Sequence, residues 1–203
     1  MPDTDSILSP KPYDAATLAR VARGKRVLIC VTGGIAAYKS ATVVSRLAQS
    51  GAIVTVAMTE AATKFVTPLT FQALSGNPVY TSPWEHHESN DPQHVSLARA
   101  VSLAVVAPCT MNTLAKLAAG LTDDVVTLIL SAIDRDKTPI VLCPSMNSEM
   151  WAQASTQRNL ETLKKDGFRF IGPDAGWQAC RTLGAGRMSE PEAILGGISD
   201  LLS

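Results

Sequence analysis

The stretch Arg26–Ser40, RVLICVTGGIAAYKS, indicates a buried strand, a glycine turn and the start of a helix. Its five apolar residues at 27–31 are typical of a strand covered on both faces, as strands of a parallel sheet usually are. Gly33 and Gly34 then allow the backbone to turn sharply, and a helix is expected from about Ile35. The first N–H groups of such a helix lack acceptors within it, so this turn can bind an anion.

The glycine spacing of this turn excludes two common phosphate-binding loops. The sequence GGIAAYKS lacks the third glycine of the GxGxxG dinucleotide motif and lacks the GK[ST] ending of a Walker A loop. A nicotinamide dinucleotide or a nucleoside triphosphate is therefore disfavoured as the ligand of this turn, whereas a ligand with one terminal phosphate is still compatible with it. The local pattern alone favours an anion site and an ordinary tight turn about equally.

The pattern of an apolar run followed by a helical segment recurs along the chain. Further strands are expected at 52–58, 101–107, 139–143 and 168–171, and helices at 36–49, 113–119, 123–133, 156–166 and 190–202. This alternation predicts an α/β fold: a three-layer, doubly wound parallel sheet, Rossmann-like or flavodoxin-like, in a single domain. Residues 1–24 are expected to form an N-terminal extension, loose to about Pro12 and with a short helix over Ala15–Arg23, ahead of a domain at 25–203.

Composition narrows the class of partner. Eighteen basic and eighteen acidic residues cancel in a chain of 203 residues, and no Lys/Arg cluster marks a nucleic-acid surface. Neither a signal peptide nor an uninterrupted apolar span is present, so we expect a cytoplasmic protein with a small-molecule ligand and no membrane contact. Cys30, Cys109 and Cys143 lie in or beside apolar runs and are expected to be buried thiols.

Polar side chains stand directly after the expected strands. They are Thr59, then Thr110, Asn112 and Thr113, then Ser145 and Asn147. Because ligands of doubly wound sheets bind beyond the carboxyl ends of the strands, these residues should converge on one crevice. Each one could equally cap the helix that follows it, and for any single residue capping is the simpler interpretation.

All three histidines fall within nine positions, which raises the question of a metal site. No carboxylate or cysteine accompanies His86 and His87 at a recognised ligand spacing, so we predict no metal and interpret both as solvated loop residues. His94 differs, because it opens a helix-like HVSLARA segment that leads into the next strand. It is therefore directed toward the sheet.

A second glycine-rich stretch, Gly176–Met188, is predicted to be a long mobile loop. Cys180 lies at its centre. One interpretation is a lid that brings a thiol to a substrate, and the other is a surface loop with an incidental cysteine.

Four motifs in order, VTGGIAAYKS, APCTMNT, PSMNSEMW and ACRTLGAGRM, together resemble the homo-oligomeric flavin-containing cysteine decarboxylases over about 26–194. The likeness is closest to the coenzyme A branch, whose substrate is 4′-phosphopantothenoylcysteine. The resemblance implies FMN as cofactor, a single phosphate that suits the anion site. It also implies a homo-oligomer, a trimer or a dodecamer of trimers, whose active sites are completed across the trimer interface.

The resemblance assigns roles position by position. It implies that FMN contacts Gly33, Gly34, Ile35, Ala36, Thr59, Thr110, Met111, Asn112, Thr113 and Ser145. Asn147 and Met150 would bind the substrate around its cysteinyl carboxylate. His94 would act as the base during oxidation, and Cys180 would return a proton to the product. Lys39 and Arg187 are candidates for the substrate's phosphate.

Departures from the family pattern are few. Arg181 and Thr182 follow Cys180 where the family more often has glycine and an acidic residue, and Met111 and Ser145 replace smaller residues. The expected partner is a separate phosphopantothenate–cysteine ligase, because no synthetase half is present. Two alternatives are a decarboxylase of peptidyl C-terminal cysteine, which Cys180 disfavours, and a non-catalytic flavin-binding regulatory protein, which His94, Asn147 and Cys180 together disfavour.

Overall fold

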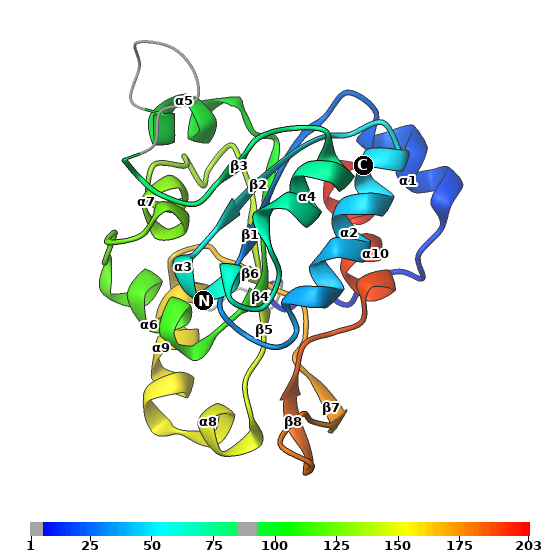
Figure 1. The fold of residues 1–203 in the computed structure, drawn as a ribbon. Helices are drawn as coiled ribbons and strands as arrows, with labels where there is room; N and C mark the ends of the chain where they lie inside the picture. Colours follow the sequence, from blue (N-terminus) through cyan, green and yellow to red (C-terminus); the bar gives the residue numbers. More distant parts are fainter. Residues whose placement is uncertain (1–5, 85–92) are drawn as a thin grey trace.

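The computed structural model describes residues 6–84 and 93–203. Its centre is a six-stranded sheet in the order β3-β2-β1-β4-β5-β6, in which each neighbouring pair of strands is parallel (Figure 1). The strands are β1 (Arg26–Val31), β2 (Ile53–Met58), β3 (Val79–Tyr80), β4 (Leu103–Cys109), β5 (Ile140–Pro144) and β6 (Arg169–Phe170). This order is that of a doubly wound dinucleotide-type sheet, and it confirms the predicted fold class.

Helices cover both faces of the sheet and make two separate apolar cores. One face carries α1 (Ala15–Ala22), α2 (Ala37–Gln49), α4 (Pro68–Ser75) and α10 (Pro191–Leu202). The other carries α5 (Gln93–Ala100), α6 (Met111–Ala119), α7 (Val125–Ser131) and α9 (Ala154–Lys165). Both faces of β1 and β4 are therefore buried, which explains why these strands are apolar without alternation.

The predicted strands and helices agree with the structure to within a few residues. Two short helices, α3 (Glu60–Thr63) and α8 (Ser148–Ala152), carry no usable periodicity and were missed, as were α4 and β3. α4 begins with Pro68 in its first turn and ends at Gly76, whose φ of 71° is left-handed, so its limits do carry sequence signals.

The prediction of a mobile loop at 176–188 is wrong. The segment forms an antiparallel hairpin of β7 (Asp174–Trp177) and β8 (Leu183–Arg187), which projects below the main sheet (Figure 1). Its glycines serve close packing. A Cβ at Gly184 would lie 2.6 Å from Ser148 Cβ, and a Cβ at Gly186 would lie 2.4 Å from the Met146 carbonyl oxygen.

The N-terminal segment is attached to the domain from Ile7 onward, contrary to the expectation of a loose arm. Ile7 bridges to Phe170, and the Leu8 N–H donates to the Phe170 carbonyl at 2.8 Å, so the arm extends the β6 edge. Lys11 follows against α10, where its carbonyl oxygen would lie 2.2 Å from a Cβ at Gly196.

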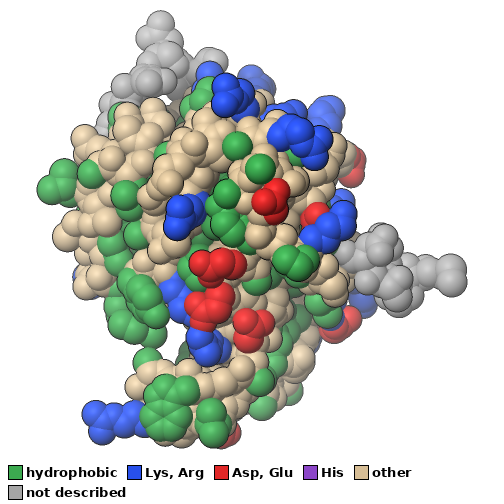
Figure 2. All heavy atoms as spheres, turned by 90° about the vertical axis from the view of Figure 1, so that its right-hand side faces the viewer, with side chains coloured by type: hydrophobic (Ala, Val, Ile, Leu, Met, Phe, Trp, Pro, Cys, Tyr) green, Lys and Arg blue, Asp and Glu red, His purple; other side chains and the backbone are tan. Residues whose placement is uncertain are grey.

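On the face that carries α1, α2 and α10, acidic and basic side chains lie close together, and the lower part of the molecule projects from the body (Figure 2). Among the described residues, no helix is long and apolar enough to cross a membrane.

Candidate functional site

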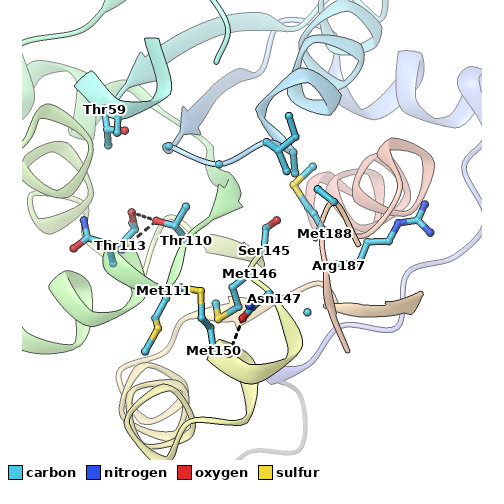
Figure 3. Close-up of a pocket in the computed structure, with 18 of the residues that line it drawn as sticks. Thr59, Thr110, Met111, Thr113, Ser145, Met146, Asn147, Met150, Arg187 and Met188 are labelled. Carbon is cyan, nitrogen blue, oxygen red and sulfur yellow. Dashed lines mark hydrogen bonds between the residues drawn. The ribbon is translucent and has the colours of Figure 1, made fainter. Parts of the chain in front are cut away.

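A cavity of about 1100 Å³ lies at the carboxyl edge of the sheet. One side is formed by the segments after β1, β2 and β4, residues 33–36, 59–61 and 110–113, which we call the strand-end wall. The other side is formed by residues 145–150 and 177–188, after β5 and on the hairpin, which we call the hairpin wall. Figure 3 shows Thr59 and Thr110 across the cavity from Asn147 and Met150.

Two buried hydroxyl groups fix the strand-end wall. Thr32 Oγ1 donates to the Pro108 carbonyl at 2.7 Å and accepts from the Thr110 N–H at 3.2 Å. Ser40 Oγ, fully buried on α2, donates to the Ala107 carbonyl. The loops after β1 and β4 are thereby held together, which sets the spacing between the glycine turn and the start of α6.

Gly33 is required for close approach and not for an unusual backbone angle. Neither Gly33 nor Gly34 is among the residues with positive φ. A Cβ at Gly33 would lie 2.4 Å from Ala61 Cβ, whereas one at Gly34 would make an ordinary contact, 3.5 Å from Thr110 Cγ2. α2 begins at Ala37, two residues later than expected, so Ile35 and Ala36 belong to the turn itself.

The predicted convergence of polar strand ends is confirmed, and so is their capping role. Thr59 Oγ1 accepts from the Ala62 N–H at 3.3 Å, Thr110 Oγ1 from the Thr113 N–H at 3.4 Å, and Asn147 Oδ1 from the Met150 N–H at 2.8 Å. The three capping residues line the cavity, together with Asn112, Ser145 and Met111. Capping uses only the oxygen of Asn147, which leaves its amide N–H groups available to a ligand.

Methionine side chains cover the part of the cavity floor nearest to α8. Met111 from the start of α6 and Met146 and Met150 from the segment after β5 gather there (Figure 3). Met150 is 40 % exposed, a large fraction for an apolar side chain. Flexible thioether chains can adapt to a flat or irregular ligand, so this floor suits an aromatic ring system or an extended substrate. Of the three, Met146 was not predicted.

A group of three charged side chains, Lys39, Arg187 and Glu190, connects α2 to the base of the hairpin; we call it the Lys39 joint. Lys39 is nearly buried; its Nζ lies 3.0 Å from Glu190 Oε1 and donates to the Met188 carbonyl at 3.3 Å. Arg187 pairs with the same carboxylate and extends away from the other labelled side chains (Figure 3). Burial, together with the charge of Arg187, lowers the pKa of Lys39 from its usual value. Both candidates for a phosphate contact therefore already hold Glu190.

A second charged group borders the cavity beyond α6 and was not predicted. Lys116 Nζ lies 2.7 Å from Asp123 Oδ1 and 2.8 Å from Asp124 Oδ2. These two carboxylates raise the pKa of Lys116, chiefly by hydrogen bonding. Asp124 also caps α7 by accepting from the Thr127 N–H at 2.9 Å, so this group fixes the loop between the two helices.

The hairpin wall carries Cys180, which is exposed, on the turn between β7 and β8. Its Sγ lies 3.0 Å from Thr182 Oγ1 and 3.5 Å from Gln178 Oε1. The other three cysteines are buried and free, as predicted, and burial raises the pKa of each well above its usual value. Cys180 is thus the thiol that a ligand in this cavity can reach.

His94 does not line the cavity in this single chain. It is half-buried on α5, whose main helical contact is with α7. His86 and His87 lie outside the described residues. Within residues 6–84 and 93–203, no group of three or more His, Cys, Asp or Glu side chains is placed to hold a metal ion.

Comparison with known proteins places the chain in a family. The flavoprotein family profile matches residues 15–203. The chain belongs to the flavoprotein family. The coenzyme A biosynthesis bifunctional protein CoaBC of Bacillus subtilis is 43% identical over 171 residues, which cover 84% of this chain and 41% of that protein. The same-named protein of Escherichia coli K12 is 43% identical over 172 residues, covering 85% and 42%. This flavoprotein chain thus spans less than half the length of these curated relatives.

Solved structures give the same assignment over nearly their whole length. A mutant of PPC decarboxylase complexed with pantothenoylaminoethenethiol superposes with a TM-score of 0.78 at 30% identity, covering 87% of this chain and 97% of that one. The FMN binding protein AtHal3 superposes with a TM-score of 0.77 at 31% identity, covering 87% and 95%. The predicted family is therefore confirmed, and its cofactor class is a flavin.

Proposed function

We propose that this flavoprotein catalyses the FMN-dependent decarboxylation of 4′-phosphopantothenoylcysteine to 4′-phosphopantetheine, a step of coenzyme A biosynthesis. The observation that carries the proposal is the cavity itself, which sets an anion-binding turn on one wall against Asn147 and the thiol of Cys180 on the other. The similarity to CoaBC proteins and to PPC decarboxylase supports the same reaction.

The strand-end wall fits FMN. α2 and α6 both begin at this wall, so their N-terminal dipoles favour a bound anion such as a single phosphate. The glycine turn brings backbone close to a ligand, and the hydroxyl groups of Thr59, Thr110 and Thr113 can hydrogen-bond polar atoms. Bound FMN would oxidise the carbon next to sulfur to a thioaldehyde, which can delocalise the electrons released with carbon dioxide, and would later return the electrons.

Asn147 would hold the cysteinyl carboxylate. With its oxygen committed to the cap of α8, the amide N–H groups can donate to the carboxylate. A neutral amide orients the carboxylate. A full positive charge would also stabilise the ground-state anion, which must lose its charge in the transition state, and would therefore slow the reaction. Met150, one turn later on the same short helix, would cover the neighbouring apolar part of the substrate.

Cys180 would supply a proton to the decarboxylated substrate. After carbon dioxide leaves, the substrate is an enethiolate that needs a proton and a hydride to become a saturated thiolate, which takes a further proton from solvent to give the thiol. The Cys180 S–H would donate the proton, and the exposed sulfur would recover one from solvent. The compound held by the superposed PPC decarboxylase mutant is an enethiol, which supports this order of events.

His94 would act as the base for the proton lost on oxidation, and we propose that it reaches the cavity of a neighbouring subunit. Its place on α5, away from the cavity of its own chain, is consistent with a site completed in a homo-oligomer. Mixing a His94→Asn variant with a Cys180→Ser variant tests this arrangement. Mixed oligomers should regain turnover if the two residues come from different chains, whereas no mixture should be active if both act within one chain.

The deciding experiment is anaerobic incubation of the flavin-loaded protein with 4′-phosphopantothenoylcysteine. We expect carbon dioxide and 4′-phosphopantetheine in equal amounts by mass spectrometry, without net reduction of the flavin. Failure to form either product, with the flavin still bound, would exclude the reaction. Conversion of a peptide with a C-terminal cysteine in place of this substrate would favour the peptidyl-cysteine alternative.

A further inference from the structure

We propose that Gln178 is a positioning residue that fixes the Cys180 turn relative to the Asn147 loop. The catalytic part of this inference rests on the proposed function. Gln178 was not singled out from the sequence. Gln178 is the last residue before the turn, and although the turn itself is exposed, Gln178 is only 7% exposed.

The Gln178 amide contacts three separate segments. Its Oε1 accepts from the Ser148 N–H at 3.1 Å, one residue after Asn147. Its Nε2 donates to the Ala185 carbonyl on β8 at 2.9 Å. The same Oε1 lies 3.5 Å from Cys180 Sγ and can accept from the thiol when Thr182 Oγ1, 3.0 Å from the sulfur, donates to it. One buried amide therefore joins both sides of the hairpin wall that the reaction uses.

The surrounding backbone leaves this amide little freedom. A Cβ at Gly186 would lie 2.4 Å from the Met146 carbonyl oxygen and 3.2 Å from Gln178 Nε2, so the glycine makes room for the amide between β8 and the Asn147 loop. The Met146 N–H also donates to the Gly186 carbonyl at 2.9 Å. Because a buried amide without partners is costly, this arrangement favours one orientation of Gln178.

The chemistry of the contact matches the role proposed for Cys180. An amide oxygen can only accept, so its interaction with sulfur requires that the sulfur carry a proton. Gln178 would thus hold Cys180 as a proton donor while the same oxygen anchors the start of α8, whose cap is Asn147. The carboxylate clamp and the proton donor would then keep a constant separation.

The test compares Gln178→Leu with Gln153→Leu in flavin-loaded protein. Gln153 is exposed and its side chain caps nothing, so its replacement controls for the loss of a surface amide. With 4′-phosphopantothenoylcysteine, Gln178→Leu should lower kcat by about 100-fold, the effect typical of a misplaced catalytic group. It should also release unsaturated enethiol while the flavin stays reduced, which a general loss of stability would not cause. Wild-type rates and no enethiol would overturn the proposal.

A second measurement needs no substrate. Cys180 is the exposed cysteine and the other three are buried, so its alkylation by iodoacetamide can be followed by peptide mass spectrometry. Loss of one neutral hydrogen bond should raise the alkylation rate of Gln178→Leu about fivefold. An unchanged rate would overturn the positioning role even if wild-type protein proved inactive on this substrate, whereas inactivity of the wild type alone would count only against the proposed function.

Gln178→Glu provides a rescue. At neutral pH its carboxylate would face the Ala185 carbonyl, two acceptors without a proton between them. Protonation at lower pH restores a donor, so the activity of this variant relative to wild type should rise as the pH falls. A pH-independent ratio would contradict the assigned hydrogen bond.

Discussion

The strand-end wall and the hairpin wall of the cavity differ in what lies behind them. Behind the strand-end wall lies the fully buried sheet, and its loops are joined by buried hydroxyl groups and by the close approach of Gly33 to Ala61. The hairpin projects from the body and exposes Trp177 and Leu183, and it is held by the close approach of its glycines to residues 146–148 and by polar contacts such as those of Gln178. Under the proposed function, cofactor binding therefore falls to the side of the buried sheet, and Cys180, which would finish the reaction, lies on the projecting hairpin.

The largest expected effect comes from removing the thiol of the hairpin wall. Cys180→Ser should lower complete turnover by about 10²–10⁴-fold, the usual contribution of a positioned acid. The first half of the reaction should survive, because the strand-end wall is unchanged, so reduced flavin and an unsaturated thiol product should accumulate under anaerobic conditions. Stopped-flow flavin absorbance with product mass spectrometry measures both. Full turnover would remove Cys180 from the mechanism.

Gly33→Ala should damage the opposite wall. The new Cβ would overlap Ala61, so backbone must shift, which costs about 1–3 kcal/mol of stability, and flavin should be lost with it. Gly34→Ala is the matched control, because its Cβ meets Thr110 at an ordinary distance and should not lower the stability of the flavin-free protein. Urea unfolding measures the stability of each variant, and flavin absorbance measures how much flavin it retains. Equal stability of both variants would contradict this prediction, because it would mean that the loop after β1 shifts to accommodate the new Cβ without loss of stability.

The strand-end wall could be predicted from sequence, and the hairpin wall only in part. Apolar runs that end in glycine, threonine or asparagine reveal strand ends, and fold rules bring those ends together. The same rules say nothing of which atoms a glycine approaches, so Gly33 was assigned to a turn and the glycines of 176–188 to a loop. Glycine is required at these positions because they closely approach Ala61, Ser148 and Met146, and only the folded structure shows these contacts.

Gln178 and His94 show the same limit at the level of single side chains. A glutamine carries no local signal that it joins three segments, since two of its three partners are 7 and 30 residues away. His94 was identified through resemblance, but its position relative to the cavity depends on packing of α5, and in the single chain it lies elsewhere. Roles that depend on another segment or another subunit escape pattern reasoning.

The Lys39 joint between the two walls should give a pH-dependent effect. In the folded protein the pKa of Lys39 is lowered, so between that pKa and its usual 10.5 the unfolded chain binds more protons. Stability contributed by this group must then rise with pH in that window. The stability of wild type relative to Lys39→Met should therefore increase as the pH rises toward 10.5, by at most about 1.4 kcal/mol per pH unit. Urea unfolding of both proteins checks this; a constant difference would contradict it.

The smallest effect is expected within the hairpin turn itself. Arg181 has a φ of 65°, a left-handed conformation in which a residue with a side chain is strained. Arg181→Gly should relieve that strain and stabilise the hairpin by up to about 1 kcal/mol. The same replacement at Arg158, an exposed position inside α9, should instead destabilise by about 1 kcal/mol, because glycine disfavours helix. Stability changes of opposite sign in the two variants would show that the backbone angle at Arg181 determines the effect of the replacement.

Amide hydrogen exchange can localise this effect. The Gln178 N–H donates to the Thr182 carbonyl and the Arg181 N–H to the Gln178 carbonyl, both at 2.9 Å, so these amides report opening of the turn. In Arg181→Gly they should exchange about fivefold more slowly, the factor that corresponds to 1 kcal/mol, while amides of β1 and β4 keep their rates. Because β7 and β8 form a sheet of their own, a change at their turn should not reach β1 and β4. Slower exchange throughout the strands would show instead that the hairpin and the core open as one unit.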